Sequence, residues 1–437
     1  MTDPGNPTTR LRDDADFRRY WWARLLSLSG TVVTLVALPV LVYRLSGSAF
    51  LTALVSALEA VPYLLFGLFA GALADRLDRR AVMVAADLAN ALVMGSVPLA
   101  HWLGVLTVPH VLAVAFLTPA IAVFFDGANF GALPVLVGRD RIATANAVVW
   151  SAATSVEIVL PALVGVALAV VDPASLLLLD ALSFVASGLC VRAITRLLHD
   201  PWRPRGPLTR RVLFGDIGAG LHFLVHHAGV RTMTMVGTVQ CLAGGGFVAL
   251  LVVWCDRILG VGTEGVRFGL VYAGWSVGAL AAAALLPRIL RRSSAAVVAL
   301  AALPFSAVLG ILTSFATWWP LAALGLMCWG SVYTLVVVNS ISYRQEVTPE
   351  ALLGRVNTAG RMLSWGLGWT VGALFAGWLS HQIGVRPALT TMASLGLVAV
   401  AVAWTSPLRR EQGEPATNSA RHAADSVGIA GEQGTAR

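Results

Sequence analysis

The chain has 437 residues, of which 57% are hydrophobic and only 12% are charged. A soluble domain carries roughly a quarter charged residues, so this composition excludes a soluble enzyme with a large core. All 31 basic residues are arginine, and their excess over the 23 acidic residues indicates either nucleic-acid binding or a membrane topology signal.

The N-terminal segment, residues 1–19, is polar and charged. It lacks the apolar stretch and the small-residue cleavage site of a secretory signal, so we expect it to remain as a cytoplasmic N-terminus. The first apolar run behind it is therefore expected to be kept as a membrane span.

Twelve apolar stretches follow along the chain, separated by charged residues or by proline and glycine. A membrane-spanning helix needs about 20 apolar residues, so twelve spans use about 240 of the roughly 250 hydrophobic residues. The predicted spans are residues 25–43, 50–74, 82–100, 106–125, 143–170, 174–191, 232–254, 266–286, 295–315, 321–341, 358–381 and 387–404.

These spans are divided into two six-helix halves, residues 20–198 and 228–408. Residues 199–212 contain Pro201, Pro204 and Pro207 and are interpreted as a cytoplasmic linker. Residues 213–227 have mixed polarity and are expected to form an amphipathic surface helix. The final segment, 409–437, is rich in small and charged residues, which predicts a disordered cytoplasmic tail.

The arginines gather on alternate loops. If the N-terminus is cytoplasmic, that side receives most of them, and the other side receives only Arg44, Arg257, Arg267 and Arg386. The positive-inside rule then places both termini in the cytoplasm. Because the positive charge is spread over short loops instead of one patch, nucleic-acid binding is no longer supported.

A faint internal repeat relates the two halves. Gly-Ala-Leu at residues 71–73 recurs at 278–280, and Asn146 corresponds to Asn357, in each case about 210 residues later. We therefore expect an all-α integral membrane protein with twelve transmembrane helices in two parallel halves, which resembles the fold of major facilitator transporters.

The loop between spans 2 and 3 resembles the signature loop of the major facilitator superfamily in sequence and position. By that resemblance, Asp75 faces the start of span 11 and Arg76 pairs with Asp126, which latches the halves in one state. The alternative is a positive-inside signal without a gating role. The residues expected in the latch are Gly71, Asp75, Arg76, Arg79, Arg80 and Asp126.

Further motifs resemble the macrolide-efflux-like branch of drug:proton antiporters, over about residues 17–408. Membership implies an exporter of bulky, mostly apolar molecules driven by proton entry. In span 5, residues 160–165 depart from the Gly-Pro and paired small residues of the usual antiporter motif, although Pro161 and Gly165 are present. The motifs are Phe124-Phe-Asp126, Leu133-Pro134, Ala145-Asn146-Ala147, Leu179-Asp180-Ala-Leu-Ser183-Phe184, Glu346-Val-Thr-Pro349 and Gly354-Arg355-Val356.

Two acids lie near the middle of predicted spans, Glu59 in span 2 and Glu157 in span 5. A charge at the bilayer centre costs about 2.5–3.5 kcal/mol of insertion free energy, so each of these acids is expected to have a structural or functional role. A carboxyl group in an apolar surrounding can bind and release a proton as a cavity opens to each side, which is what proton coupling requires. The alternative is an acid that hydrogen-bonds a neighbouring helix or meets a water-filled cavity without coupling. Asp180 is interpreted as structural.

Aromatic and amide side chains within the spans are candidates for substrate binding, because large apolar ligands occupy mainly apolar pockets with few polar anchors. The aromatic residues could equally face lipid or pack between helices. The candidates are Tyr63, Trp150, Gln240, Tyr333 and Asn339.

No metal or cofactor site is expected. The four cysteines have neither disulfide nor zinc spacing, and His222 and His226 have no acidic or cysteine partner nearby in the sequence. Gly244-Gly-Gly246 lies in an apolar span without a following Lys-Ser/Thr, so ATP drive is unsupported.

The sequence therefore predicts a secondary active transporter, not an enzyme, in the inner (plasma) membrane. We expect proton-coupled export of small hydrophobic drugs or secondary metabolites by a monomer that contacts the lipid bilayer. Two alternatives stay open: the same fold carrying another cargo, such as a siderophore, a lipid or a nutrient, or a receptor or scaffold that no longer transports.

Overall fold

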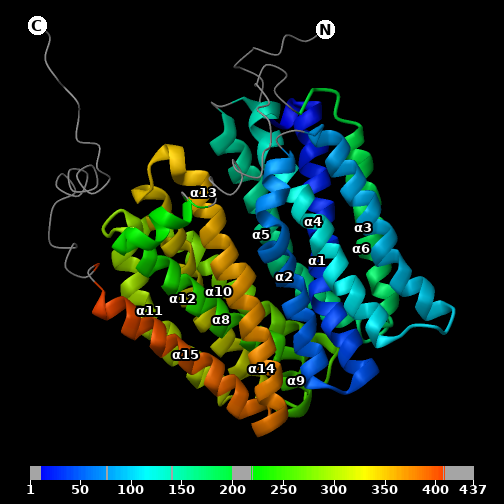
Figure 1. The fold of residues 1–437 in the computed structure, drawn as a ribbon. Coiled ribbons are helices and arrows are strands. Elements are labelled where there is room, and N and C mark those ends of the chain that lie inside the picture. Colours follow the sequence, from blue (N-terminus) through cyan, green and yellow to red (C-terminus); the bar gives the residue numbers. More distant parts are fainter. Residues whose placement is uncertain are drawn as a thin grey trace, which may run out of the picture.

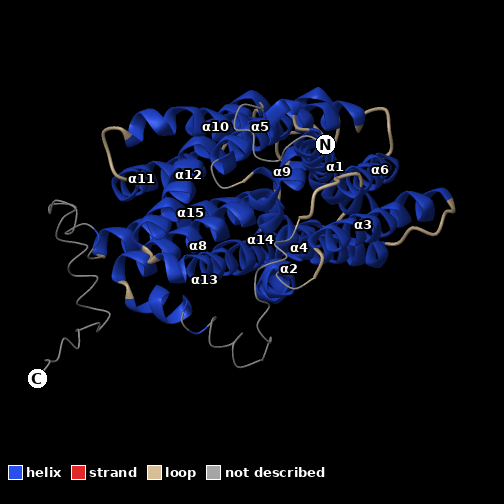
Figure 2. Cartoon of the chain, turned by 90° about the horizontal axis from the view of Figure 1, so that it is seen from above, coloured by secondary structure: helices blue, strands red, loops and turns tan. Residues whose placement is uncertain are grey.

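The computed structural model describes residues 11–74, 77–138, 141–198, 218, 220–406 and 408, and no strand occurs among them (Figures 1 and 2). Twelve helices are long and apolar enough to cross a membrane, which confirms the predicted number of spans. The N-terminal half contains α1 (Ala15–Ser46), α2 (Ala49–Ala74), α3 (Arg79–Trp102), α4 (Val108–Val137), α5 (Ile142–Ala167) and α6 (Pro173–Arg192), after the short helix η1 (Leu11–Asp13).

The C-terminal half repeats six spans with two interruptions. Its helices are α8 (Ala228–Ala249), the short α9 (Leu251–Arg257), α10 (Gly265–Leu290), α11 (Ala295–Ser314), α12 (Trp319–Val347), α13 (Glu350–Arg361), η3 (Met362–Trp369), α14 (Thr370–Ile383) and α15 (Val385–Thr405). The eleventh span consists of α13, η3 and α14 in sequence, and η3 is a π-helix.

Several helices extend beyond the apolar stretches. The clearest case is α1, which begins at Ala15, ten residues before the predicted start of span 1. Asp14 caps it by accepting hydrogen bonds from the backbone N–H groups of Asp16 (3.1 Å) and Phe17 (3.2 Å). Hydropathy detects only the apolar part of a helix, whereas a polar end continues wherever its cap and its packing partners support it.

The two halves stand side by side, with α1–α6 on one side of the molecule and α8–α15 on the other (Figure 1). Within the halves α1 and α3 pack against α6, α2 against α4, and α12 against α10 and α11. Between the halves α5 packs along α10, and α2 packs along η3 and α14 (Figure 2). The largest cluster of buried hydrophobic residues contains residues of both halves, and three further clusters each lie within one half.

Several predicted segments lie wholly or partly outside the described residues. These are most of the N-terminal segment, the linker at 199–212, residues 213–217 and 219 of the expected surface helix, and the tail at 409–437. Residues 220–226 are helical, and the rings of His222 and His226 stack 3.9 Å apart. Within the described part of the chain no group of three potential ligands could hold a metal ion.

Candidate functional site

A polar network around Arg257 joins the halves at the distal end of the molecule, the end opposite the first turn of α1 (Figure 1). Tyr43 donates a hydrogen bond to Asp256 Oδ2 (2.7 Å). Arg257 donates from Nε to the Tyr43 hydroxyl (3.0 Å) and from Nη2 to the Gly47 carbonyl oxygen (2.8 Å). Its guanidinium carbon lies 5.7 Å from the Tyr43 ring centroid. Since Tyr43 and Gly47 belong to the N-terminal half, these contacts close the distal end.

A second contact at this end involves Arg44, at the end of α1. Arg44 donates from Nε to Thr263 Oγ1 (3.2 Å) and pairs with Glu264 through Nη2. The two charged side chains are 32% and 50% exposed. Exposed ion pairs contribute only about 0–1 kcal/mol, so the Arg257 network is expected to hold the halves together more strongly.

We predict that Arg257→Ala opens the distal end more than the matched variant Arg44→Ala. Arg257→Ala removes two hydrogen bonds and a cation–π contact and should shift the equilibrium by about 5–150-fold, whereas Arg44→Ala should shift it less than about fivefold. Spin labels introduced at the exposed residues Leu103 and Gln382 would report the distance between the halves. Equal populations of the open state in the two variants would contradict this ranking.

Two glycines bring α5 and α10 into backbone contact near the distal end. A Cβ atom at Gly165 would lie 2.5 Å from the Gly269 Cα, and one at Gly269 would lie 2.7 Å from the Ala162 carbonyl oxygen. Such distances are too short for any side chain, so only glycine permits this approach. The span 5 segment that departs from the usual antiporter motif thus keeps the glycine that the contact needs.

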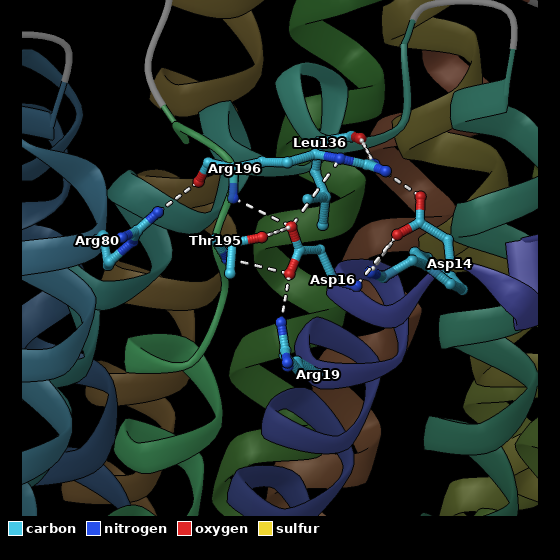
Figure 3. Close-up of polar contacts among 8 residues, drawn as sticks. Asp14, Asp16, Arg19, Arg80, Leu136, Thr195 and Arg196 are labelled. Atoms are coloured by element: carbon cyan, nitrogen blue, oxygen red, sulfur yellow. Dashed lines mark hydrogen bonds and ion pairs between the residues drawn. The ribbon is translucent and has the colours of Figure 1, made fainter. Parts of the chain in front are cut away.

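At the proximal end, where α1 begins, two predicted gating residues bind within the N-terminal half. Arg79 Nη1 donates to the carbonyl oxygens of Gly131 (2.8 Å) and Leu198 (3.1 Å), and Arg80 Nη2 donates to that of Arg196. The contacts with Leu198 and Arg196 attach the segment after α6 to α3, and Figure 3 shows the one between Arg80 and Arg196.

Asp16 fixes the same segment onto α1 (Figure 3). This carboxylate is 4% exposed and accepts hydrogen bonds from the backbone N–H groups of Thr195 (3.0 Å) and Arg196 (3.0 Å). The Thr195 hydroxyl and Arg19 Nη1 also donate to it, each at 2.8 Å. Nothing in the sequence pattern had indicated this anchor, because Thr195 and Arg196 are distant from Asp16 along the chain.

The structure does not describe the contacts of the other residues of the expected latch in the loop after α2. Asp75 and Arg76 lie outside the described residues, and Gly71 lies in the last turn of α2. The latch built on Asp75 and Arg76 therefore stays a prediction.

Asp126 on α4 contacts the other half of the molecule through Arg361. The Arg361 Nη2 atom lies 3.8 Å from Asp126 Oδ2, which also accepts a hydrogen bond from the Tyr63 hydroxyl (3.4 Å). The Arg361 guanidinium carbon lies 5.0 Å from the Tyr63 ring centroid. Sequence reasoning expected Arg76 as the partner and missed Arg361, although an arginine inside predicted span 358–381 was itself a signal.

The π-helix η3 directly follows Arg361. A π-helical turn holds more residues than an α-helical turn, so it changes the side of the span that the preceding residues face. On the α14 side, Val371, Phe375 and Trp378 form an exposed apolar stripe, which is suited to contact with lipid. Arg361 points instead to α2 and α4 of the other half.

Glu157 lies on a polar face of α5. It shares this face with Trp150 and Thr154, at helical spacings of i, i+4 and i+7, and the Trp150 side chain is 69% exposed. The opposite exposed face carries Val148, Val159 and Val166 and is suited to lipid. Glu157 is itself exposed, and in the described structure it makes no hydrogen bond or ion pair.

The polar face of α5 is one of two exposed faces that separate the side packed on α1 from the side packed on α10. It lies between the side that packs on α1, marked by Val149 and Ala153, and the side that contacts α10, marked by Ala162 and Gly165. An unpaired acid inside a membrane requires a protein-lined or watery surrounding, which the lipid-facing side does not provide.

Glu59 lies on α2 one turn before Tyr63 and is partly exposed. It has no hydrogen bond or ion pair among the described residues, and it interacts electrostatically with Tyr272 on α10 of the other half. By contrast, Asp180 is fully buried and accepts hydrogen bonds from Thr34 and from Ser183 (3.2 Å). Its partners lie within the N-terminal half, in keeping with a structural role.

The three substrate candidates of the C-terminal half are buried in this structure. Gln240 lies on α8, and Tyr333 and Asn339 lie on α12. The Tyr333 hydroxyl donates to Cys241 Sγ (3.8 Å). Gln240 Nε2 and Asn339 Oδ1 find no hydrogen-bond partner in the described structure. The structure therefore separates these three from Trp150, which is exposed, and Tyr63, which is partly exposed, both on the N-terminal half.

Comparisons with known proteins agree with this arrangement. A model of the transmembrane secretion effector family matches residues 7–434. The chain is 28% identical to the multidrug efflux pump Tap of Mycolicibacterium fortuitum over 394 residues, which cover 87% of this chain and 93% of that protein. It is 26% identical to macrolide efflux protein A of Streptococcus pyogenes over 224 residues, 51% of this chain and 54% of that protein.

Solved structures of low sequence identity share the fold. A bacterial homologue of the human lysosomal transporter Spinster, in an inward-facing and unoccupied conformation, superposes with a TM-score of 0.71 at 13% identity, covering 92% of this chain and 97% of that one. The nucleoside transporter NupG gives 0.67 at 12% identity, covering 91% and 98%. These matches confirm the predicted fold of twelve membrane-spanning helices in two six-helix halves.

Proposed function

Because the chain belongs to the transmembrane secretion effector family and is a membrane transporter rather than an enzyme, we propose that it exports hydrophobic drugs or secondary metabolites in exchange for protons. The named relatives support the export of drugs, since they are a multidrug efflux pump and a macrolide efflux protein. The observation that carries proton coupling is the unpaired Glu157 on the polar face of α5.

Coupling requires an acid that can be neutral or charged in one transport cycle. When the site faces the outside, Glu157 takes up a proton and becomes neutral, which removes the desolvation penalty for moving it through the membrane. When the site faces the cytoplasm, the proton leaves and a substrate binds. Glu59 lies against the other half and is a second candidate for this exchange.

Alternating access supplies the movement between these states. The Arg257 network and the Gly165–Gly269 contact close the distal end, which we assign to the outside. Asp126 and Arg361 meet nearer the proximal end with their side chains 26% and 47% exposed, so this pair is weaker and can serve as a gate.

Substrate binding would begin on the accessible aromatic residues Tyr63 and Trp150. The buried candidates Gln240, Tyr333 and Asn339 would take part after the C-terminal half rearranges. The unsatisfied amide atoms of Gln240 and Asn339 then offer one donor and one acceptor to a bound molecule.

We propose that the protein lies in the cell inner (plasma) membrane with both termini cytoplasmic, because the positive-inside rule assigns the arginine-rich segments of the sequence to the cytoplasmic side. We also propose that it acts as a monomer, with two halves of a single chain forming the transport path.

The decisive test is drug resistance in a host that lacks its own efflux pumps. We expect expression of the chain to protect against at least one hydrophobic drug in a chemically varied panel, and a protonophore to remove that protection. Protection that survives the protonophore would contradict proton coupling. An absence of any phenotype across the panel would favour another cargo or a receptor without transport activity.

A further inference from the structure

A small hollow lies between α1 and α5, separate from the polar face that carries Glu157. Residues Trp21, Arg24 and Leu28 of α1 and Val149, Ala152 and Ala153 of α5 line it. Its volume is about 30 Å³, far below the roughly 300–1,000 Å³ of pockets for drug-sized ligands. The hollow can therefore admit one small polar group, such as an oxygen atom of a headgroup, and the rest of any ligand would lie outside it.

The indole N–H of Trp21 is a donor without a partner. The Nε1 atom is buried and makes no hydrogen bond in the described structure. The ring packs edge-on against Trp22, with centroids 4.8 Å apart. Leaving a buried donor unsatisfied costs about 1–3 kcal/mol, so an acceptor in the hollow would stabilise the protein.

Arg24 provides a second donor and a positive charge in the same hollow. Its guanidinium carbon lies 5.5 Å from the Phe125 ring centroid. It forms no hydrogen bond or ion pair with any described residue. The acids in its surroundings are already engaged, since Asp126 pairs with Arg361 and Asp87 accepts a hydrogen bond from Ser187 (2.7 Å).

The remaining lining is apolar and contributes no acceptor. The hollow thus combines two hydrogen-bond donors, one of them cationic, with leucine, valine and alanine side chains. This combination suits a ligand in which an anionic oxygen group is attached to an apolar chain. A guanidinium binds a phosphate or carboxylate through two parallel hydrogen bonds, and the indole N–H can supply a third.

The position of the hollow along the membrane normal is suited to binding an amphiphile. Trp21 and Arg24 lie six and nine residues after the start of α1, and Val149 lies seven residues after the start of α5. At 1.5 Å per residue these positions are roughly 9–14 Å from the helix ends, near the boundary between headgroups and hydrocarbon.

We propose that Trp21 and Arg24 form a binding site for the anionic headgroup, phosphate or carboxylate, of an amphiphile. The ligand is either an anionic lipid of the surrounding leaflet or a transported amphiphile that enters from it. Binding at this site does not depend on the export proposed above, because a lipid would occupy it in a chain that does not transport.

The first arm of the test measures lipid binding by the full chain. Protein in nanodiscs of phosphatidylcholine with added phosphatidylglycerol is released in a native mass spectrometer, and bound phosphatidylglycerol is counted. Trp21→Phe keeps the ring but removes the donor, and should weaken retention about fivefold to tenfold; Arg24→Gln should weaken it more, and Arg24→Lys less. Arg231→Gln removes a cation that contacts the Val225 carbonyl oxygen (3.1 Å) and should leave retention unchanged.

The second arm identifies the source of the ligand. Proteoliposomes are loaded with radiolabelled laurate, and its transport is compared between wild type, Trp21→Phe and Arg231→Gln. Loss of phosphatidylglycerol retention in the Trp21 and Arg24 variants assigns the site to a membrane lipid, and a specific loss of laurate transport in Trp21→Phe assigns it to a substrate. If neither probe distinguishes these variants from wild type while circular dichroism shows them folded, the proposal is overturned.

Discussion

Glu157→Gln is expected to abolish transport driven by a proton gradient while the protein stays folded and inserted in the membrane. Glutamine has nearly the same size and removes the titratable group, so packing on the polar face of α5 is preserved. Without a group that alternates between neutral and charged forms, the pH gradient no longer biases the transport cycle. Substrate exchange across the membrane in the absence of a gradient should persist.

The measurement is uptake of a transported drug into inside-out vesicles, with and without a pH gradient, alongside exchange at equal pH. Asp172→Asn is the matched control, because Asp172 caps α6 through the Ala174 N–H (2.8 Å) and asparagine is an equally good cap. If drug uptake by Glu157→Gln depends on the pH gradient as strongly as uptake by the wild type, Glu157 is not the coupling residue. Glu59→Gln is then the next variant to examine.

Gly269→Ala is expected to prevent full closure of the distal end. The added Cβ would lie 2.7 Å from the Ala162 carbonyl oxygen and 2.9 Å from its Cα atom, and a backbone cannot move aside as a flexible side chain can. The two helices must separate, at a cost of about 1–3 kcal/mol for overpacking. That energy shifts the equilibrium toward the outward-open state by about 5–150-fold and slows transport accordingly.

The distance between labels at Leu103 and Gln382 and the rate of drug efflux would be measured together. Gly95→Ala is the matched control, since a Cβ at Gly95 meets the Ala181 Cβ at 3.7 Å, an ordinary contact. If Gly269→Ala transports at the rate of Gly95→Ala with an unchanged label distance, the close contact has no part in gating. Gly165→Ala should behave like Gly269→Ala, because both glycines belong to one contact.

The spans could be predicted from the sequence because membrane insertion depends on local composition. Stretches of about 20 apolar residues are visible without any knowledge of folding, and so is the bias of arginines toward alternate loops. The midspan acids Glu59 and Glu157 stood out for the same reason, since an acid is conspicuous in an apolar segment. The polar ends of the helices were missed, as the early start of α1 at Ala15 shows.

Partners of individual side chains could not be predicted in this way. Arg79 and Arg80 bind backbone carbonyl groups in the N-terminal half, whose positions depend on how α3, α4 and the segment after α6 meet. Their expected gating role stays a prediction. Likewise, Arg361 reaches Asp126 from the other half and follows a π-helix that no sequence pattern had indicated.

The sequence by itself determined that this protein spans a membrane twelve times in two related halves, and which segments cross. Those properties follow from the transfer of each segment between water and lipid, which depends on residues close together in the chain. The tertiary structure alone decided which faces of the helices meet, which end is closed, and which polar groups are left without a partner. Those properties depend on contacts between residues far apart in the sequence, such as Tyr43 with Arg257 and Gly165 with Gly269.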